Sequence, residues 1–274
     1  MLSHGTMPSP GILAQDEPHP LEIVNAEGAS PFVLVCEHAG RIIPRALGDM
    51  GLSDEDRARH IAWDIGARPV AEALSALLGA PLFLQRYSRL VCDCNRRPDV
   101  PSFAPEISEA TTIPANVVLS EAERTARAES IFWPFHDALR AFLDARRDAG
   151  IPTLLVSIHT FTPVFLGVPR PWEIGVLYNR DPVFAPSIAD WMQRNTDHCV
   201  GVNEPYSVGD DTDYAIPVHG ERRGLPCVEF EIRNDLVPDD AAADRWARLL
   251  ERSLQAGADT IDATRGKRAA TGGE

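Results

Sequence analysis

Long apolar runs and clusters of basic residues are both missing from this 274-residue sequence. No window approaches the roughly 18 apolar residues of a membrane-spanning helix, and the first residues lack the basic stretch followed by an apolar one that marks an export signal. The 40 acidic residues outnumber the 26 basic ones and give a formal charge of −14, which repels phosphate backbones and anionic membranes. We therefore expect a cytoplasmic protein that binds neither nucleic acid nor membranes, and the oligomeric state stays open.

Cysteine is scarce, and its spacing contains no metal-binding or redox motif. The five cysteines include no C-x-x-C pair and lie mostly inside apolar runs. We expect them to be small core residues in a reducing compartment. A thiolate nucleophile at Cys36 beside His38 is the alternative. It is weak because the two residues flank Glu37 and share a strand face only if no turn intervenes.

No internal repeat and no change of composition divides the sequence, so we expect one folded domain. With 44% hydrophobic residues, the chain can bury one large core. Short apolar runs alternate with helical patterns, which is typical of a mostly parallel sheet with helices on both faces. The predicted fold class is therefore mixed α/β. Residues 30–263 form the domain, residues 1–29 an extended or disordered arm, and residues 264–274 a flexible tail.

Three apolar runs are predicted as buried strands that each lead into an ionisable residue. These residues are His38, His159 and Glu231. Open α/β sheets place their ligands at the carboxyl ends of the strands. Because three convergent polar ends are hard to explain by packing alone, the leading hypothesis is a metal-dependent hydrolase.

Asp64 lies at the start of a predicted helix between two of these strands. A catalytic zinc site usually takes three protein ligands from His, Asp and Glu, and keeps a water. His38, Asp64 and His159 supply such a set only if their strands are neighbours. Spacing alone leaves other roles open, because Asp64 also suits a helix cap and either histidine suits an ordinary hydrogen-bonded role.

Two further segments have less regular patterns. Residues 82–84 and 90–92 are predicted as a hairpin-like pair of strands, and the proline-rich residues 98–118 as a long loop. Loops of that length in a compact domain are usually functional or mobile. Whether this loop closes over a substrate stays open.

Five motifs follow one another along the sequence. They are V-L-V-C-E-H-A-G (33–40), A-W-D-I-G-A (62–67), S-R-L-V-C-D-C-N-R (88–96), S-I-H-T-F (157–161), and V-H-G followed by L-P-C-V-E-F-E-I-R-N-D-L (225–236). In this order they resemble the N-formylglutamate amidohydrolase family, from about residue 31 to residue 237. The resemblance implies a zinc-dependent hydrolase of an N-acyl amino acid. It also implies a phosphorylase/hydrolase-like fold related to zinc carboxypeptidases and cell-wall amidases.

The resemblance assigns metal-ligand roles to His38, Asp64 and His159, in agreement with the argument from the strand ends. It implies one Zn²⁺ ion, with other divalent metals as alternatives. Glu37 departs from the family pattern, because many members carry proline before the histidine. This glutamate either perturbs the metal site or adds a second carboxylate beside it.

Amide hydrolysis needs a base that takes a proton from water and gives it to the departing nitrogen. Glu231 fits this role and the resemblance favours it, but strand alternation puts Glu229 on the same face, so the sequence does not choose between them. A buried ion pair with Arg233 is the alternative for such a glutamate. His219 is a further catalytic candidate that would contact the oxyanion or the substrate, although a surface histidine is the simpler interpretation.

The substrate that the resemblance implies is a small anionic N-acyl amino acid, N-formyl-L-glutamate, whose two carboxylates need fixed cations. Arg89, Arg96 and Arg233 lie within the matching motifs and are predicted to bind them, because a planar guanidinium binds carboxylate through two hydrogen bonds. Asn95 is predicted to orient the substrate. Asp93 is predicted to hold Arg89 or Arg96 in place.

The preferred hypothesis is hydrolysis of the formyl C–N bond to give L-glutamate and formate, which the family resemblance connects with histidine degradation. Two alternatives stay open. One is a related zinc amidase or peptidase with a different acyl or peptidyl substrate. The other is a metal-free binding module on the same fold, against which the presence of His38, Asp64, His159 and Glu231 together argues.

Overall fold

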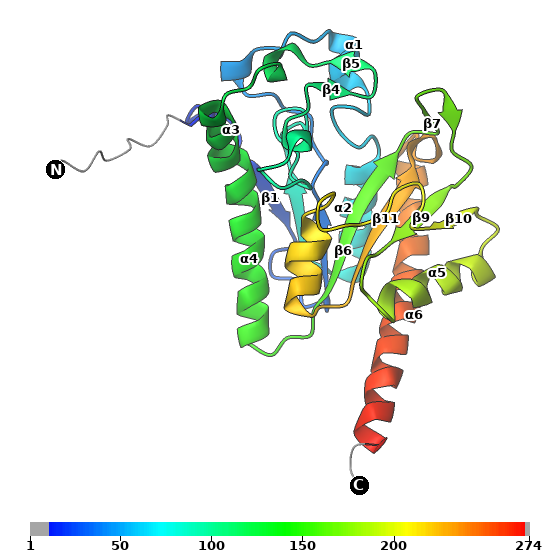
Figure 1. Cartoon of the computed structure of the whole chain (residues 1–274). Helices are drawn as coiled ribbons and strands as arrows, with labels where there is room; N and C mark the ends of the chain where they lie inside the picture. The colour runs from blue at the N-terminus through cyan, green and yellow to red at the C-terminus, as the bar shows by residue number, and fades with distance from the viewer. Residues whose placement is uncertain (1–10, 272–274) are drawn as a thin grey trace, which may run out of the picture.

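A seven-stranded sheet runs through the centre of the molecule, and helices pack on both of its faces (Figure 1). The computed structural model describes the backbone of residues 11–271 and the side chains of residues 11–264. The sheet has the strand order β1-β3-β2-β6-β11-β9-β10. Its strands are β1 (Leu21–Val24), β2 (Phe32–Cys36), β3 (Leu82–Gln85), β6 (Leu154–Phe161), β9 (Ile174–Leu177), β10 (Val200–Val202) and β11 (Cys227–Arg233).

The central strands of this sheet are parallel. β2 pairs in parallel with β3 and β6, β6 with β11, and β9 with β10, whereas the β1–β3 and β9–β11 pairings are antiparallel. The predicted mixed, mostly parallel α/β sheet is confirmed. The hairpin-like pairing of residues 82–84 with residues 90–92 is wrong, because the Val91 N–H turns back to the carbonyl of Ser88 and residues 90–92 form no strand.

Helices cover the two faces unequally. α2, α5 and α6 pack on one face in one hydrophobic cluster, and α4 packs on the other face in a second cluster. The α-helices are α1 (Asp54–Ala58), α2 (Ala67–Leu78), α3 (Glu121–Arg127), α4 (Trp133–Asp148), α5 (Phe184–Asn195) and α6 (Asp240–Thr271). Shorter helical turns are η1 (Arg45–Leu47), η2 (Pro101–Phe103), η3 (Pro114–Asn116), η4 (Ala128–Phe132), η5 (Ala215–Gly220), η6 (Glu221–Arg223) and η7 (Asn234–Leu236).

Strand β2 shows why the sequence forms a buried sheet rather than an amphipathic one. Val33 and Val35 pack into the cluster under α4, whereas Leu34 and Cys36 pack into the cluster under α2. Because both faces are covered, the strand is apolar at every position, as central parallel strands are. Four of the five cysteines are buried, and Cys199 is exposed.

The ends of the chain join the fold further than the sequence indicates. Residues 21–24, within the predicted arm, form edge strand β1, and residues 264–271, within the predicted tail, continue α6. The strand is only four residues long and contains Glu22, so its pattern is weak. Residues 1–10 and 272–274 of the predicted arm and tail lie outside the described residues. No helix in the described part of the chain is long and apolar enough to cross a membrane.

Two small antiparallel ribbons lie beyond the carboxyl ends of the central strands. They are β4 (Ile107–Ser108) with β5 (Thr111–Thr112), and β7 (Val164–Phe165) with β8 (Val168–Pro169). Figure 1 shows the β4–β5 ribbon with α1 on one side of that end and the β7–β8 ribbon on the other. The long loop predicted at residues 98–118 thus contains a short ribbon.

The turn after β2 depends on Gly40. A Cβ atom at this position would lie 2.0 Å from the backbone oxygen of Arg86. We expect Gly40→Ala to lower the free energy of unfolding by about 2 kcal/mol or more, because two backbone segments must separate. Urea unfolding measures this. Gly48→Ala is the control, since its Cβ meets nothing within 4 Å and only its positive φ of 58° adds strain, at a cost of about 1 kcal/mol. Equal losses in the two variants would contradict the packing argument.

Candidate functional site

The parallel pairing of β2 with β6 brings the first predicted site residues together. His38 lies just beyond the end of β2, after Glu37, and His159 lies near the carboxyl end of β6. Asp64 is fixed from the loop before α2, where its N–H donates to the carbonyl of His38 at 3.0 Å. The helix-capping alternative for Asp64 is wrong, because α2 begins after Gly66 without a side-chain cap.

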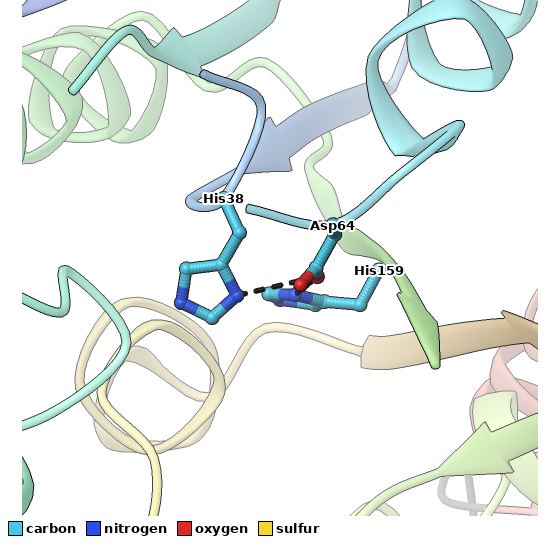
Figure 2. Close-up of side chains that lie close together, drawn as sticks. All are labelled: His38, Asp64 and His159. Atoms are coloured by element: carbon cyan, nitrogen blue, oxygen red, sulfur yellow. Dashed lines mark hydrogen bonds and ion pairs between the residues drawn. The ribbon is translucent and has the colours of Figure 1, made fainter. Parts of the chain in front are cut away.

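His38, Asp64 and His159 converge on one buried point (Figure 2). The Oδ2 atom of Asp64 lies 3.2 Å from Nδ1 of His38 and 2.7 Å from Nδ1 of His159. One ligand atom from each residue lies within 4.8 Å of the others, and all three side chains are buried. This is the nitrogen and oxygen donor set that zinc accepts.

The opposite sides of both imidazole rings face other carboxylates. Nε2 of His38 lies 2.7 Å from Oδ1 of Asp93. Nε2 of His159 lies 3.2 Å from Oε2 of Glu37, without hydrogen-bond geometry. An ionised carboxylate only accepts hydrogen bonds, so the His38 Nε2 must donate, and in a neutral ring Nδ1 then carries a lone pair. That lone pair points at Asp64.

A lone pair that faces a carboxylate oxygen requires a cation between them, either a proton or a metal ion. The attraction between the imidazole rings and the carboxylates also shifts the pKa values of Asp64 and His159. Burial alone would raise the pKa of Asp64, but His38 and His159 outweigh it and hold that pKa well below its usual range. Burial opposes the charged form of His159, yet Glu229, Asp64 and Glu37 raise its pKa well above the ordinary value. The three residues therefore fit a bound cation.

Asp93 links His38 to neighbouring residues through hydrogen bonds. Besides His38, it accepts hydrogen bonds from the Nη2 atom of Arg89 at 2.7 Å and from the backbone N–H of Asn95 at 2.8 Å. The prediction that Asp93 holds Arg89 is confirmed. Glu37 is held in a similar way, because its Oε2 accepts from the Ser157 hydroxyl at 2.8 Å.

Glu231 and Glu229 project from β11, the strand on the other side of β6. Glu231 is the register partner of His159, and both glutamates line one pocket, as strand alternation predicts. Among the described residues, Glu231 Oε2 has no hydrogen-bond partner. Burial raises the pKa of Glu231 well above its ordinary value and that of Glu229 to about 8. The alternative ion pair of Glu231 with Arg233 does not form.

The pocket is a cavity of about 740 Å³ over this cluster. One wall comes from the 98–118 segment, which contributes residues 107–109. The opposite wall comes from Phe165 of the β7–β8 ribbon and from residues 203–207. Residues 107–109 and Phe165 belong to the two ribbons that Figure 1 shows at this end of the sheet, whereas residues 203–207 follow β10. His38, His159, Glu229 and Glu231 form the floor of this pocket.

Three of the predicted substrate-binding residues line the pocket: Arg89, Asn95 and Arg96. Arg89 is held between Asp93 and Asp64, with Nη1 3.4 Å from Asp64 Oδ1. Asn95 Oδ1 accepts from the N–H groups of two residues at the start of η5, and its Nδ2 lies 3.4 Å from Glu229 Oε2. Asn95 therefore joins the pocket floor to η5.

The structure does not bring the other two predicted residues to this pocket. Arg233 donates its Nε to Asp235 at 2.8 Å, and its Nη1 lies 3.4 Å from three backbone carbonyls. His219 lies inside η5, where its Nε2 is 3.0 Å from Nδ1 of His136. The surface interpretation of His219 is wrong, because the ring is fully buried. Neither residue is among the described ones that line the pocket.

Tyr206 and Asp213 also line the pocket, although no sequence pattern predicts a function for either residue. Asp213 lies 3.4 Å from Nη1 of Arg96, and Tyr206 accepts a hydrogen bond from Arg170. Both residues come from an irregular, glycine- and aspartate-rich segment. This segment has neither helical nor strand periodicity, so nothing in the sequence places these two side chains near the strand ends.

Comparisons with known proteins find one matching family model and similar solved structures. The model of a family described as N-formylglutamate amidohydrolase matches residues 30–237. A gene product of Agrobacterium tumefaciens, known from its crystal structure, is 37% identical, with a TM-score of 0.89 over 92% of this chain and 99% of that one. An N-formylglutamate amidohydrolase from Ralstonia eutropha JMP134 shares the fold at 18% identity, with a TM-score of 0.69 over 90% of this chain and 100% of that one. A comparison with curated protein sequences finds no significant match.

Proposed function

The chain belongs to the N-formylglutamate amidohydrolase family, and from this premise we propose that it hydrolyses N-formyl-L-glutamate to L-glutamate and formate with the help of a divalent metal ion. One observation carries the proposal. Two imidazole Nδ1 atoms and a carboxylate oxygen converge at the floor of a pocket beside a buried carboxyl group, Glu231, that has no partner among the described residues.

The donor set supports Zn²⁺ as the ion, held by His38, Asp64 and His159. When bound, such an ion polarises the amide carbonyl and lowers the pKa of water. Asp93 keeps the His38 ring oriented through Nε2, and Glu37 lies beside Nε2 of His159. Carboxylates behind ligand histidines fix the tautomer and raise the basicity of the facing nitrogen. In this proposal Glu37 therefore supports the site, although many family members carry proline there.

Glu231 is proposed to move the proton. Its carboxylate takes a proton from the attacking water at Oε2, and the resulting carboxylic acid gives that proton to the amide nitrogen as the C–N bond breaks. Burial, which raises its pKa from the ordinary value of a glutamate, suits a group that must both accept and donate near neutral pH. Glu229 accepts a hydrogen bond from Nδ2 of Asn95 and is proposed to orient that side chain at the floor of the pocket.

The substrate side of the proposal uses Arg96 and Asn95. Among the described contacts, Arg96 engages only Nη1, so its other nitrogens are available to a carboxylate. Each side-chain nitrogen of Arg89 instead donates to Asp93 or Asp64, and we assign Arg89 to positioning these two carboxylates. The substrate is thus a small anionic N-acyl amino acid.

A second candidate substrate follows from the size of the pocket. A cavity of about 740 Å³ lies in the range that accepts ligands of drug size, whereas N-formylglutamate is much smaller. A longer acyl or a peptidyl group on the same amide would use this space. The chemistry and the metal ligands would be unchanged.

The metal assignment predicts the behaviour of His159→Ala. Wild-type protein should contain about one equivalent of zinc, and His159→Ala should lose it, because one of three protein ligands is gone. Elemental analysis of purified protein measures this. His198→Ala is the control, since His198 is exposed and pairs with Glu173, and it should keep the metal. Full metal retention in His159→Ala would refute the ligand assignment.

The proton-transfer role predicts a difference between two neighbouring glutamates. Glu231→Gln should keep the metal but reduce kcat by about 10² or more, as loss of a general base does. Glu229→Gln is the matched variant on the same strand face and should lose less. Single-turnover hydrolysis with metal-loaded proteins separates the two. An active Glu231→Gln together with an inactive Glu229→Gln would move the role to Glu229.

The substrate assignment is tested with a panel of N-acyl amino acids. We expect the highest kcat/KM for N-formyl-L-glutamate, with lower values for N-formyl-L-methionine and N-acetyl-L-glutamate, measured by release of the free amine. Equal activity on neutral formyl amino acids would reject recognition by arginine. A clear preference for longer acyl or peptidyl groups would favour the second candidate.

A further inference from the structure

The pocket contains many more acidic than basic groups. Its lining includes Asp93, Glu109, Glu204, Asp213, Glu229 and Glu231, but only two arginines, Arg89 and Arg96. A substrate with two carboxylates would be repelled by this lining unless guanidinium groups with available N–H donors face it.

The two arginines of the lining offer few N–H donors to the substrate carboxylates. All three side-chain nitrogens of Arg89 lie within 3.4 Å of the carboxylates of Asp93 and Asp64. Arg96 retains donors, because its described contacts, to Asn95 and Asp213, both use Nη1. One guanidinium thus remains for one of the two substrate carboxylates, and the other carboxylate has no assigned cation.

Arg170, which follows β8, is built differently from these two. Its guanidinium lies over three aromatic rings, those of Phe161, Phe165 and Tyr206, at 5.7, 4.6 and 4.8 Å. Its Nη1 donates to the Tyr206 hydroxyl oxygen at 2.8 Å. Within residues 11–264, it forms no ion pair with a carboxylate. The aromatic rings therefore hold this cation in place without neutralising it.

Tyr206 connects Arg170 to the pocket. Tyr206 and Phe165 both line the cavity, whereas Arg170, which contacts both rings, is not itself among the described lining residues. Because Arg170 donates to the phenol oxygen, the phenol proton is left to donate to another acceptor. Burial raises the pKa of Tyr206, the Glu231 carboxylate adds to the rise, and Arg170 and Arg89 oppose it. The hydroxyl therefore lies within electrostatic reach of the proposed catalytic glutamate.

We infer that Arg170 and Tyr206 form a carboxylate-binding subsite at the wall of the pocket. One carboxylate of the substrate accepts a hydrogen bond from the Tyr206 hydroxyl, which Arg170 orients through its own hydrogen bond, and the Arg170 cation attracts this carboxylate. The other carboxylate is left to Arg96. This inference rests on the proposed function, since its ligand is the anionic amino acid part of that substrate.

Steady-state kinetics of Arg170→Gln test the subsite. The substrates are N-formyl-L-glutamate and its two monoamides, one lacking the side-chain carboxylate and the other the α-carboxylate. KM for N-formyl-L-glutamate should rise about tenfold to hundredfold with kcat little changed, because the cation and the hydrogen bond that orients the Tyr206 hydroxyl are both lost. KM for the monoamide that lacks the carboxylate bound here should change much less. Arg170→Lys should recover part of the loss, and Tyr206→Phe should cause a smaller rise.

Arg194→Gln alters an exposed arginine of α5 that pairs with Asp190, and its KM should equal that of the wild type. If Arg170 merely fastened the β7–β8 ribbon, Arg170→Gln would lower kcat or raise KM equally for all three substrates. That result, or an unchanged KM, would overturn the subsite.

Glutarate binding separates this inference from the proposed function, because glutarate has two carboxylates and no amide. Isothermal titration calorimetry of metal-loaded protein should show wild type binding at least about tenfold more tightly than Arg170→Gln. That result in a protein that hydrolyses no N-acyl amino acid would support the subsite and reject the proposed function alone. Equal binding by both proteins, or no binding by wild type, would reject the subsite and leave the hydrolase proposal standing.

Discussion

One carboxylate oxygen, Oδ2 of Asp64, faces the Nδ1 atoms of two buried histidine rings, and the charge balance around this atom constrains the whole site. Buried acids and lone pairs without positive charge between them are costly away from water. Asp93 and Glu37 behind the rings increase the demand for a cation. The parallel order β2-β6-β11 creates this convergence, because it places the polar ends of three neighbouring strands at one edge of the sheet.

The same charge balance determines how this acidic protein would accept the proposed anionic substrate. Arg89 donates hydrogen bonds to Asp93 and Asp64, so its positive charge stabilises these two carboxylates rather than a ligand. Positive charge available to a substrate must come from arginines whose donors remain open. Arg96 meets this requirement because only its Nη1 has described contacts. Arg170 meets it because aromatic rings, rather than carboxylates, hold its guanidinium in place.

The sequence predicted the parts of this structure that depend on local pattern. The apolar runs before His38 and His159 were predicted as buried strands, and they are neighbours in the sheet. Sequence reasoning failed where tertiary contacts decide the outcome. Residues 90–92 are as apolar as a strand, but the preceding Ser88 and Arg89 donate their N–H groups to the carbonyls of Ile42 and Ala62, and the chain turns after them.

Long side chains were the least predictable feature. Arg233 and Arg96 lie in matching motifs, yet Arg233 is held by Asp235 and backbone carbonyls away from the pocket. Tyr206 reaches the pocket from a loop without any period, so its place depends on how that loop packs. Motif position fixes the backbone of such residues, whereas local partners decide where the side chain points.

Anomalous X-ray diffraction from crystals grown with Zn²⁺ would show directly whether a metal ion lies among His38, Asp64 and His159. We expect one strong peak about 2.0–2.1 Å from Nδ1 of both histidines and about 2.0–2.2 Å from a carboxylate oxygen of Asp64. A fully loaded ion bound to other residues, or no peak between these three side chains, would contradict the metal-ligand assignment.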